Sequence, residues 1–129
     1  MDILIVEDNK TDIKIIRQAL DKFQINLYVE HEGEAALKYL SNNRPDLIIL
    51  DLNLMKIDGR EILQYIKTHD DLHAIPVIIY TTSRDRNDIK EAYKHGANAY
   101  VSKPFSLKDA LRAMDALGAF WVGFVRYDE

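Results

Sequence analysis

The chain has 129 residues, of which 47% are hydrophobic and 29% charged, and its formal net charge is −4. This size and composition predict one globular domain with a full core. The negative charge and the lack of a Lys/Arg block argue against a surface that binds nucleic acid. The chain has no cysteine, which excludes disulfides and thiolate metal sites. Because no apolar run is as long as a membrane span and no signal peptide precedes the first strand, we expect no membrane segment and a cytoplasmic protein.

The predicted elements alternate from the first residues on. Four apolar residues at 3–6 form a strand-like run that ends in Glu7 and Asp8. Asn9 is a suitable N-cap for a helix that follows. That helix is indicated by apolar residues at helical spacing, Ile13, Ile16, Leu20 and Phe23. The next elements expected are a short strand at 26–30 and a short helix at 33–41.

The central strand is expected at 46–51. Pro45 precedes it, four apolar residues run without a break, and the carboxylate of Asp51 closes it. A run of this kind is typical of a strand that is buried on both faces of a parallel sheet. Further elements then follow: a helix around 62–66, a strand at 77–80, a helix ending at Gly96, a strand at 98–102 and a last helix from about Ser106. This fivefold alternation predicts an α/β fold, a doubly wound five-stranded parallel sheet flanked by five helices.

Acidic side chains are expected to gather at one edge of this sheet. Glu7 and Asp8 follow the first strand and Asp51 follows the central one, and the carboxyl ends of parallel strands meet at the same edge. Three clustered carboxylates repel one another, so a cation would stabilise them and the pKa of at least one should be raised without it. Oxygen ligands without His or Cys favour Mg²⁺.

Two further strands end in polar residues at the same edge, Thr81 and Lys103. A carboxylate nucleophile, an acid pair, a hydroxyl and an ammonium form a set that handles phosphoryl groups. Asp51 is the candidate nucleophile, since Asp can form an aspartyl-phosphate. No glycine-rich phosphate loop is present, so nucleotide binding is not supported.

Five segments in order resemble the receiver domain of two-component response regulators, of the single-domain chemotaxis-protein type. They are ILIVEDN, RPDLIILDLNL, Asp58-Gly59, YTTS and GANAYVSKPF. The resemblance implies a flavodoxin-like fold with strand order 2-1-3-4-5. It also implies a switch that is phosphorylated on an aspartate by a histidine kinase and that hydrolyses its own phosphate slowly, a signalling component rather than an enzyme.

The resemblance also implies a role for each motif residue. Asp51 would accept the phosphoryl group. Asp8, Asp51, the backbone carbonyl of Asn53 and, through water, Glu7 would hold Mg²⁺. Lys103 would pair with Asp51 or its phosphate, across a cis Lys103–Pro104 bond. Thr81 would bond the phosphate while Tyr100 swings inward behind it. A half-buried packing residue is the alternative for Tyr100.

Two positions depart from the usual family pattern. Met55 replaces the usual Pro, which leaves open how rigid the 52–58 loop is. Thr82 replaces a very small residue and, with Asn53, is expected to tune access to the phosphate. Asn53 also stands where an Asp-nucleophile phosphohydrolase has its general acid, which weighs against that alternative. A constitutive binding module is the other alternative, but it would lack one of Asp8, Asp51, Thr81 or Lys103, and all four are present.

The partners are less well specified. DLNLMKIDGREIL, the Thr81-Thr82-Ser83 triplet and Phe120-Trp121 resemble small regulators that partner phytochrome-type histidine kinases. A sensor histidine kinase, and a histidine phosphotransfer protein as an onward acceptor, are therefore expected.

The C-terminal segment is strongly apolar. The last helix is expected to place Leu107, Leu111, Met114 and Leu117 in the core, and residues from about 118 add an apolar helical extension to the 1–129 domain, loosened by Gly118 and Gly123. Exposed apolar patches mark interfaces, so we expect a homodimer through this C-terminal face. The alternative is a tail that folds back onto the core.

Overall fold

The computed structural model describes residues 1–127, so the last two residues of the predicted domain, Asp128 and Glu129, lie outside the described residues. Its elements in chain order are β1 (Asp2–Val6), α1 (Lys10–Leu20), β2 (Asn26–Glu30), α2 (Gly33–Asn42), β3 (Leu47–Leu50), α3 (Gly59–Thr68), β4 (Val77–Thr81), α4 (Arg86–Lys94), β5 (Ala99–Ser102) and α5 (Leu107–Gly123). All strand pairs are parallel, in the order β2-β1-β3-β4-β5. The predicted fold class and strand order are confirmed.

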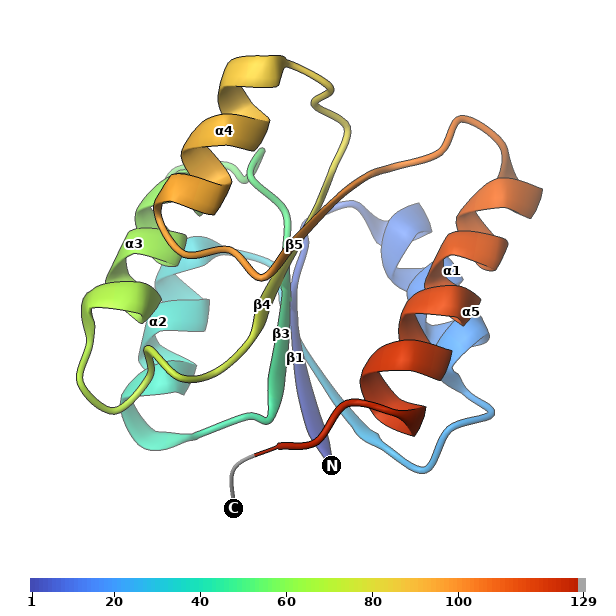
Figure 1. The fold of residues 1–129 in the computed structure, drawn as a ribbon, viewed down its shortest axis with the longest axis horizontal. Helices are drawn as coiled ribbons and strands as arrows, with labels where there is room; N and C mark the ends of the chain where they lie inside the picture. The colour runs from blue at the N-terminus through green and yellow to red at the C-terminus, as the bar shows by residue number, and fades with distance from the viewer. Residues whose placement is uncertain (128–129) are drawn as a thin grey trace.

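The sheet is covered on both faces, with α1 and α5 on one side and α2, α3 and α4 on the other (Figure 1). Successive residues of a strand point to opposite faces. In β3, Ile48 and Leu50 face the α2–α4 side, whereas Leu47 and Ile49 face the α1/α5 side. All four are fully buried. This explains why the central strand is an unbroken apolar run rather than an alternating one.

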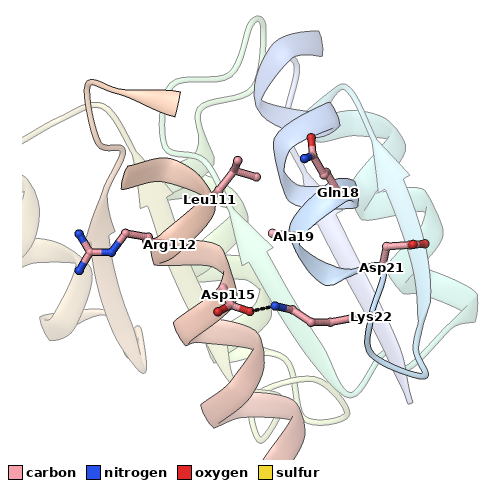
Figure 2. Close-up of a pocket in the computed structure, with 7 residues that line it drawn as sticks. All are labelled: Gln18, Ala19, Asp21, Lys22, Leu111, Arg112 and Asp115. Atoms are coloured by element: carbon pink, nitrogen blue, oxygen red, sulfur yellow. Dashed lines mark ion pairs between the residues drawn. The ribbon is translucent and has the colours of Figure 1, made fainter. Parts of the chain in front are cut away.

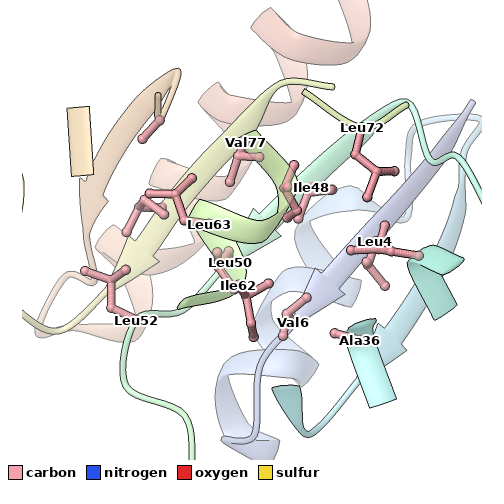
Figure 3. Close-up of a cluster of buried hydrophobic side chains, with 14 of the residues drawn as sticks. Leu4, Val6, Ala36, Ile48, Leu50, Leu52, Ile62, Leu63, Leu72 and Val77 are labelled. Carbon is pink, nitrogen blue, oxygen red and sulfur yellow. The ribbon is translucent and has the colours of Figure 1, made fainter. Parts of the chain in front are cut away.

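The core on the α2–α4 side joins the strands to the helices that cover this face (Figure 3). Leu4 and Val6 of β1 lie there with Ala36 of α2 and with Ile62 and Leu63 of α3. The side chain of Asp58 caps α3 by accepting a bond from the Arg60 N–H, whereas α2 begins after Glu32 without a side-chain cap. For α3, capping and burial together fix where the helix starts relative to the sheet edge. Among the described residues, no helix is both long and apolar enough to span a membrane.

The prediction for the last helix was wrong at Leu107, and it did not include the packing role of Gly118. Leu107, the first residue of α5, is 61% exposed, and the buried stripe consists of Ala110, Met114, Leu117 and Gly118. Gly118 does not loosen the helix. A Cβ at this position would lie 2.5 Å from the Phe23 ring and 2.7 Å from a Leu20 methyl group, so glycine allows α5 to pack closely against α1. Residues 118–123 are the last turns of α5.

Candidate functional site

The acidic residues predicted to converge do so at the carboxyl edge of the sheet. Val6 and Leu50 are paired in the β1/β3 ladder, and the Asp51 N–H donates to the Val6 carbonyl at 3.0 Å. Each of Glu7, Asp8 and Asp51 therefore places a carboxylate oxygen within 4.8 Å of the others. Glu7 and Asp51 are almost fully buried, whereas Asp8 is half-buried. The strand order, which makes β1 and β3 neighbours, is what creates this cluster.

Lys103 reaches the same point from the end of β5. Its N–H donates to the Thr81 carbonyl at 2.7 Å, which extends the β4/β5 ladder by one residue. Its buried Nζ lies 2.8 Å from Glu7 Oε1 and 2.9 Å from Asp51 Oδ2. The Lys103–Pro104 bond is trans, so the expected cis bond was wrong. Trans is the lower-energy form of an X–Pro bond, and Lys103 enters the site with it.

A third carboxylate, which the sequence reasoning missed, also holds Lys103. Asp12 Oδ2 of α1 lies 2.7 Å from Lys103 Nζ. The available signal was the capped helix start: Asn9 caps α1 by accepting from the Asp12 N–H at 2.9 Å, so Asp12 is fixed in the first turn above the acidic edge. Which way its carboxylate points depends on the position of Lys103, 91 residues away, and no local pattern encodes that.

Burial and like charge shift the titration of the site. The pKa of Glu7 is raised from 4.5 to about 7, first by burial and then by repulsion from Asp51, against the attraction of Lys103. The expectation of a raised carboxyl pKa is thus confirmed, with burial rather than repulsion as its largest cause. Burial would lower the pKa of Lys103, but its hydrogen bonds to Asp12, Glu7 and Asp51 outweigh burial and raise it. Lys103 is therefore a permanent cation.

The outer rim of the site is formed by amide and hydroxyl groups. The Asn53 N–H donates to Asp51 Oδ1 at 3.0 Å. The Asn53 side-chain amide donates to the hydroxyls of Thr81 and Thr82, both at 3.3 Å. Thr81 is fully buried and Thr82 is exposed. The two residues expected to tune access, Asn53 and Thr82, therefore lie side by side and are linked at the mouth of the site.

The departure at Met55 has a structural consequence. The Met55 N–H donates to Asp8 Oδ2 at 3.3 Å, a bond that a proline could not make. The next residue, Lys56, has a left-handed backbone with φ 67°. At the other end of this loop, a Cβ on Gly59 would lie 2.1 Å from the Asp51 carbonyl oxygen. The loop is thus held at both ends against residues of the acidic cluster.

Tyr100 lies outside the acidic cluster and is half-buried against the core. Its hydroxyl donates to the Ser83 carbonyl at 3.0 Å, in the segment that follows Thr81. The Ser83 hydroxyl donates in turn to Asp88, which also pairs with Arg60 at 2.9 Å. Tyr100 is therefore connected to the β4 end of the site through one loop, a link that the sequence did not reveal.

The groove between α1 and α5 is separate from this site (Figure 2). Its lining comes from the end of α1, the residues that follow it and the middle of α5, and Lys22 and Asp115 form an ion pair there. It contains none of the predicted site residues, so the chemistry is assigned to the sheet edge.

The fold and the site together define the class: a doubly wound α/β domain with an acidic cluster, a hydroxyl and a buried lysine at the carboxyl edge is a receiver-type signalling domain. The protein-family model of the response regulator receiver domain matches residues 3–115 of this chain. This chain belongs to that family, whose members are signalling switches rather than classical enzymes.

Individual relatives agree over almost the whole chain. Response regulator Rcp1 of Synechocystis sp. is 38% identical over 129 residues, covering 93% of this chain and 88% of Rcp1. The probable methanogenesis regulatory protein FilR2 of Methanothrix harundinacea is 36% identical over 132 residues, covering 96% and 85%. Among solved structures, the Mn²⁺-bound form of Rcp1 matches with a TM-score of 0.94, at 36% identity over 99% of both chains. The phosphorylated cyanobacterial phytochrome response regulator RcpA matches with a TM-score of 0.96, at 35% identity over 99% and 98%.

The acidic cluster fits a divalent metal ion. Its donors are carboxylate oxygens, which hard cations prefer, and they lie close enough together to share one ion. The relative Rcp1 has a solved structure in a Mn²⁺-bound form.

Proposed function

We propose that this chain is a phosphorylation switch that accepts a phosphoryl group from a kinase phosphohistidine on Asp51, in a Mg²⁺-dependent reaction. The observation that carries this proposal is the contact of the Lys103 ammonium with Asp51 at 2.9 Å in a buried site. A carboxylate oxygen that is held beside a fixed cation is placed to act as a nucleophile. The phosphorylated form of the relative RcpA supports the same chemistry.

The proposed reaction makes one bond and breaks one. An Asp51 carboxylate oxygen attacks phosphorus, the phosphorus–nitrogen bond to the kinase imidazole breaks, and the leaving imidazole keeps the electron pair. Lys103 donates to an oxygen of the transferred group, and the Thr81 hydroxyl donates to another. The same arrangement then allows water to remove the phosphoryl group slowly. Asn53 and Thr82, at the mouth of the site, restrict the approach of that water.

The proposed metal ligands are Asp8, Asp51, the Asn53 backbone carbonyl and, through water, Glu7. Bound Mg²⁺ supplies positive charge that neutralises the oxygens of the transferred group. The carboxylates of Glu7 and Asp8 are turned toward Asp51 and are therefore suited to this role.

The deciding experiment is to incubate the protein with acetyl phosphate and Mg²⁺ and to measure its intact mass. The proposal predicts one phosphate adduct that lasts for minutes, that requires Mg²⁺, and that is absent from Asp51→Asn. Steady release of phosphate from the donor without an adduct would instead indicate a phosphohydrolase. Neither adduct nor turnover would indicate a constitutive binding module.

The proposed output is a rearrangement of the β4–α4 segment. When Thr81 moves toward the phosphoryl group it pulls on Ser83, which holds the Tyr100 hydroxyl. The β4–α4 segment would then shift between two arrangements. The size of the shift is set by the difference between their affinities for the phosphoryl group. Tyr100 is the proposed switch residue.

The proposed donor is a sensor histidine kinase of the phytochrome type. RcpA is a cyanobacterial phytochrome response regulator, and another neighbour, AtBRR, is a bacteriophytochrome response regulator that is 37% identical. A histidine phosphotransfer protein is the proposed acceptor if the phosphoryl group of Asp51 is passed onward. Because such kinases take their phosphoryl group from ATP, we place this chain in the cytoplasm. Faster transfer from a phytochrome-type kinase than from a chemotaxis-type kinase would support this partner; equal rates would contradict it.

We also propose that the chain forms a homodimer through its C-terminal face. Phe120 is 54% and Phe124 is 77% exposed, whereas Trp121 and Val122 pack on the core. Aromatic side chains in water are frequent anchors of protein contacts. Light scattering should give a dimer mass for the wild type and a monomer mass for Phe120→Ala with Phe124→Ala. A wild type that remains monomeric at high concentration, with and without phosphate, would contradict the dimer.

A further inference from the structure

Lys103 is held by more carboxylates than the reaction requires. Its ammonium group has three N–H donors, and the structure gives each one an acidic partner: Asp12 at 2.7 Å, Glu7 at 2.8 Å and Asp51 at 2.9 Å. Glu7 and Asp51 belong to the proposed metal and phosphoryl site. Asp12 belongs to neither, because it lies on α1 and its oxygens are not part of the acidic triad.

Asp12 is free to make this contact because its usual local partner is already taken. It is the third residue of α1, and an acid at this position commonly reaches back to the N–H of the N-cap residue. Here the N-cap is Asn9, and its N–H donates instead to Glu7 Oε2 at 3.2 Å. The Asp12 N–H is in turn held by the Asn9 side chain at 2.9 Å. The helix start is thus complete without the Asp12 carboxylate, which is turned toward Lys103.

The contact is sheltered from water, which gives it strength. The side chain of Lys103 is 8% exposed and that of Asp12 is 23% exposed. Hydrogen bonds between charged groups are stronger than neutral ones, and screening by solvent is reduced when the pair is mostly buried. An exposed ion pair of the same geometry would contribute little.

We propose that Asp12 is a positioning residue for Lys103, holding the ammonium in place when its bond to Asp51 is exchanged for one to the transferred phosphoryl group. This inference rests on the proposed phosphotransfer to Asp51. At that moment one N–H of Lys103 turns from Asp51 to the phosphoryl group, and Glu7 would be one of the residues that hold the metal. Asp12 is then the anchor that does not change partner. Displacing a catalytic group by about 1 Å has a large effect on rate, so an anchor of this kind acts on the transition state of phosphoryl transfer and on that of phosphoryl hydrolysis.

The test compares Asp12→Ala with the wild type in acetyl phosphate and Mg²⁺. The maximal rates of phosphorylation and of phosphate loss should both fall at least about tenfold, while the donor concentration at half-maximal rate stays unchanged. Asp12→Glu, which keeps the charge, should restore part of both rates. Asp21→Ala is the matched control, because Asp21 is an exposed aspartate at the other end of α1.

Three results would overturn the inference. Unchanged maximal rates in Asp12→Ala would show that Lys103 does not need this anchor. A lower half-maximal donor concentration with unchanged maximal rates would show that Asp12 acts only through its charge, by repelling the anionic donor. A loss of unfolding free energy without any rate change would assign Asp12 a purely structural role and would equally overturn it.

A second measurement does not depend on phosphotransfer. In the metal-free wild type, the Lys103 ammonium should give a resolved ¹H–¹⁵N NMR signal, because its protons are hydrogen-bonded to three carboxylates and exchange slowly with water. That signal should be lost or strongly broadened in Asp12→Ala and retained in Asp21→Ala. Should the wild type accept no phosphoryl group, the proposed function fails; should the signal be unaffected by Asp12→Ala, the positioning role fails independently.

Discussion

Glu7 makes the stability of the metal-free protein depend on pH in a way that can be worked out from the site. Its pKa is about 7 in the folded protein and has the ordinary value of 4.5 when the chain is unfolded. Between these two values the folded protein holds a proton that the unfolded chain has released. The free energy of unfolding must therefore fall as the pH rises through this window. The contribution of Glu7 is fully present below about 4.5 and is lost above about 7.

The size of the effect follows from the two pKa values. The difference corresponds to about 3 kcal/mol of unfolding free energy between pH 4.5 and pH 8, with a slope of at most about 1.4 kcal/mol per pH unit. Glu7 is 2% exposed, so screening by solvent reduces this free-energy difference very little. In Glu7→Gln the group no longer titrates, and this part of the pH dependence should disappear even if the variant is offset in overall stability.

The assay is urea denaturation in EDTA at a series of pH values from 5 to 8.5. The difference in unfolding free energy between wild type and Glu7→Gln should change from pH 5 to about pH 7 and level off above it. Glu34→Gln, an exposed glutamate of α2, is the control and should follow the wild-type curve. Because metal ligands bind in their ionised form, the stabilisation by added Mg²⁺ should increase over the same range. Wild-type and Glu7→Gln curves that run parallel would refute the reasoning.

Three other outcomes are expected. Gly59→Ala should lower the unfolding free energy by about 3 kcal/mol or more and impair phosphorylation, since the new Cβ would meet the backbone of Asp51 and Leu52. Gly123→Ala, which has open space around it, is the matched control in urea melts. Equal stabilities of the two variants would contradict this expectation. Thr82→Ala should speed either phosphorylation by acetyl phosphate or loss of the phosphate, because it removes a hydroxyl from the mouth of the site, and stopped-flow or mass measurements that find both rates unchanged would show that Thr82 does not restrict access. Asp51→Asn should prevent phosphorylation yet leave the metal-free melting temperature equal or higher, since repulsion with Glu7 is relieved; a clear fall in that temperature would count against it.

Local pattern was sufficient for the sheet and for most of the site. The run from Leu47 to Leu50 has no polar position, which is possible only for a strand covered on both faces, and this indicated the doubly wound sheet. Parallel strands place their carboxyl ends at one edge, so the arrival of Glu7, Asp8 and Asp51 at that edge followed from sequence order and strand type. The family resemblance supplied the strand order that makes β1 and β3 neighbours. These features could be predicted because they depend on neighbours along the chain and on one rule of sheet geometry.

Contacts that depend on how helices pack could not be predicted in this way. Gly118 was expected to loosen the helix, but it is the position where α5 approaches Phe23 and Leu20 of the opposite segment. Leu107 had the spacing of a core residue and yet is exposed at the first position of α5. In both cases the outcome depends on the length and tilt of the helix over the sheet, which periodicity does not specify.

The sequence by itself determined which chemical groups meet at the sheet edge, and only the tertiary structure decided which of them hold one another. The contact between Asp12 and Lys103 joins a helix start to the end of the last strand, 91 residues apart. The link from Tyr100 to Ser83 joins two strand ends through a single carbonyl. The physical reason is that a hydrogen bond depends on positions within a few tenths of an ångström, and such positions arise only when the whole chain has packed.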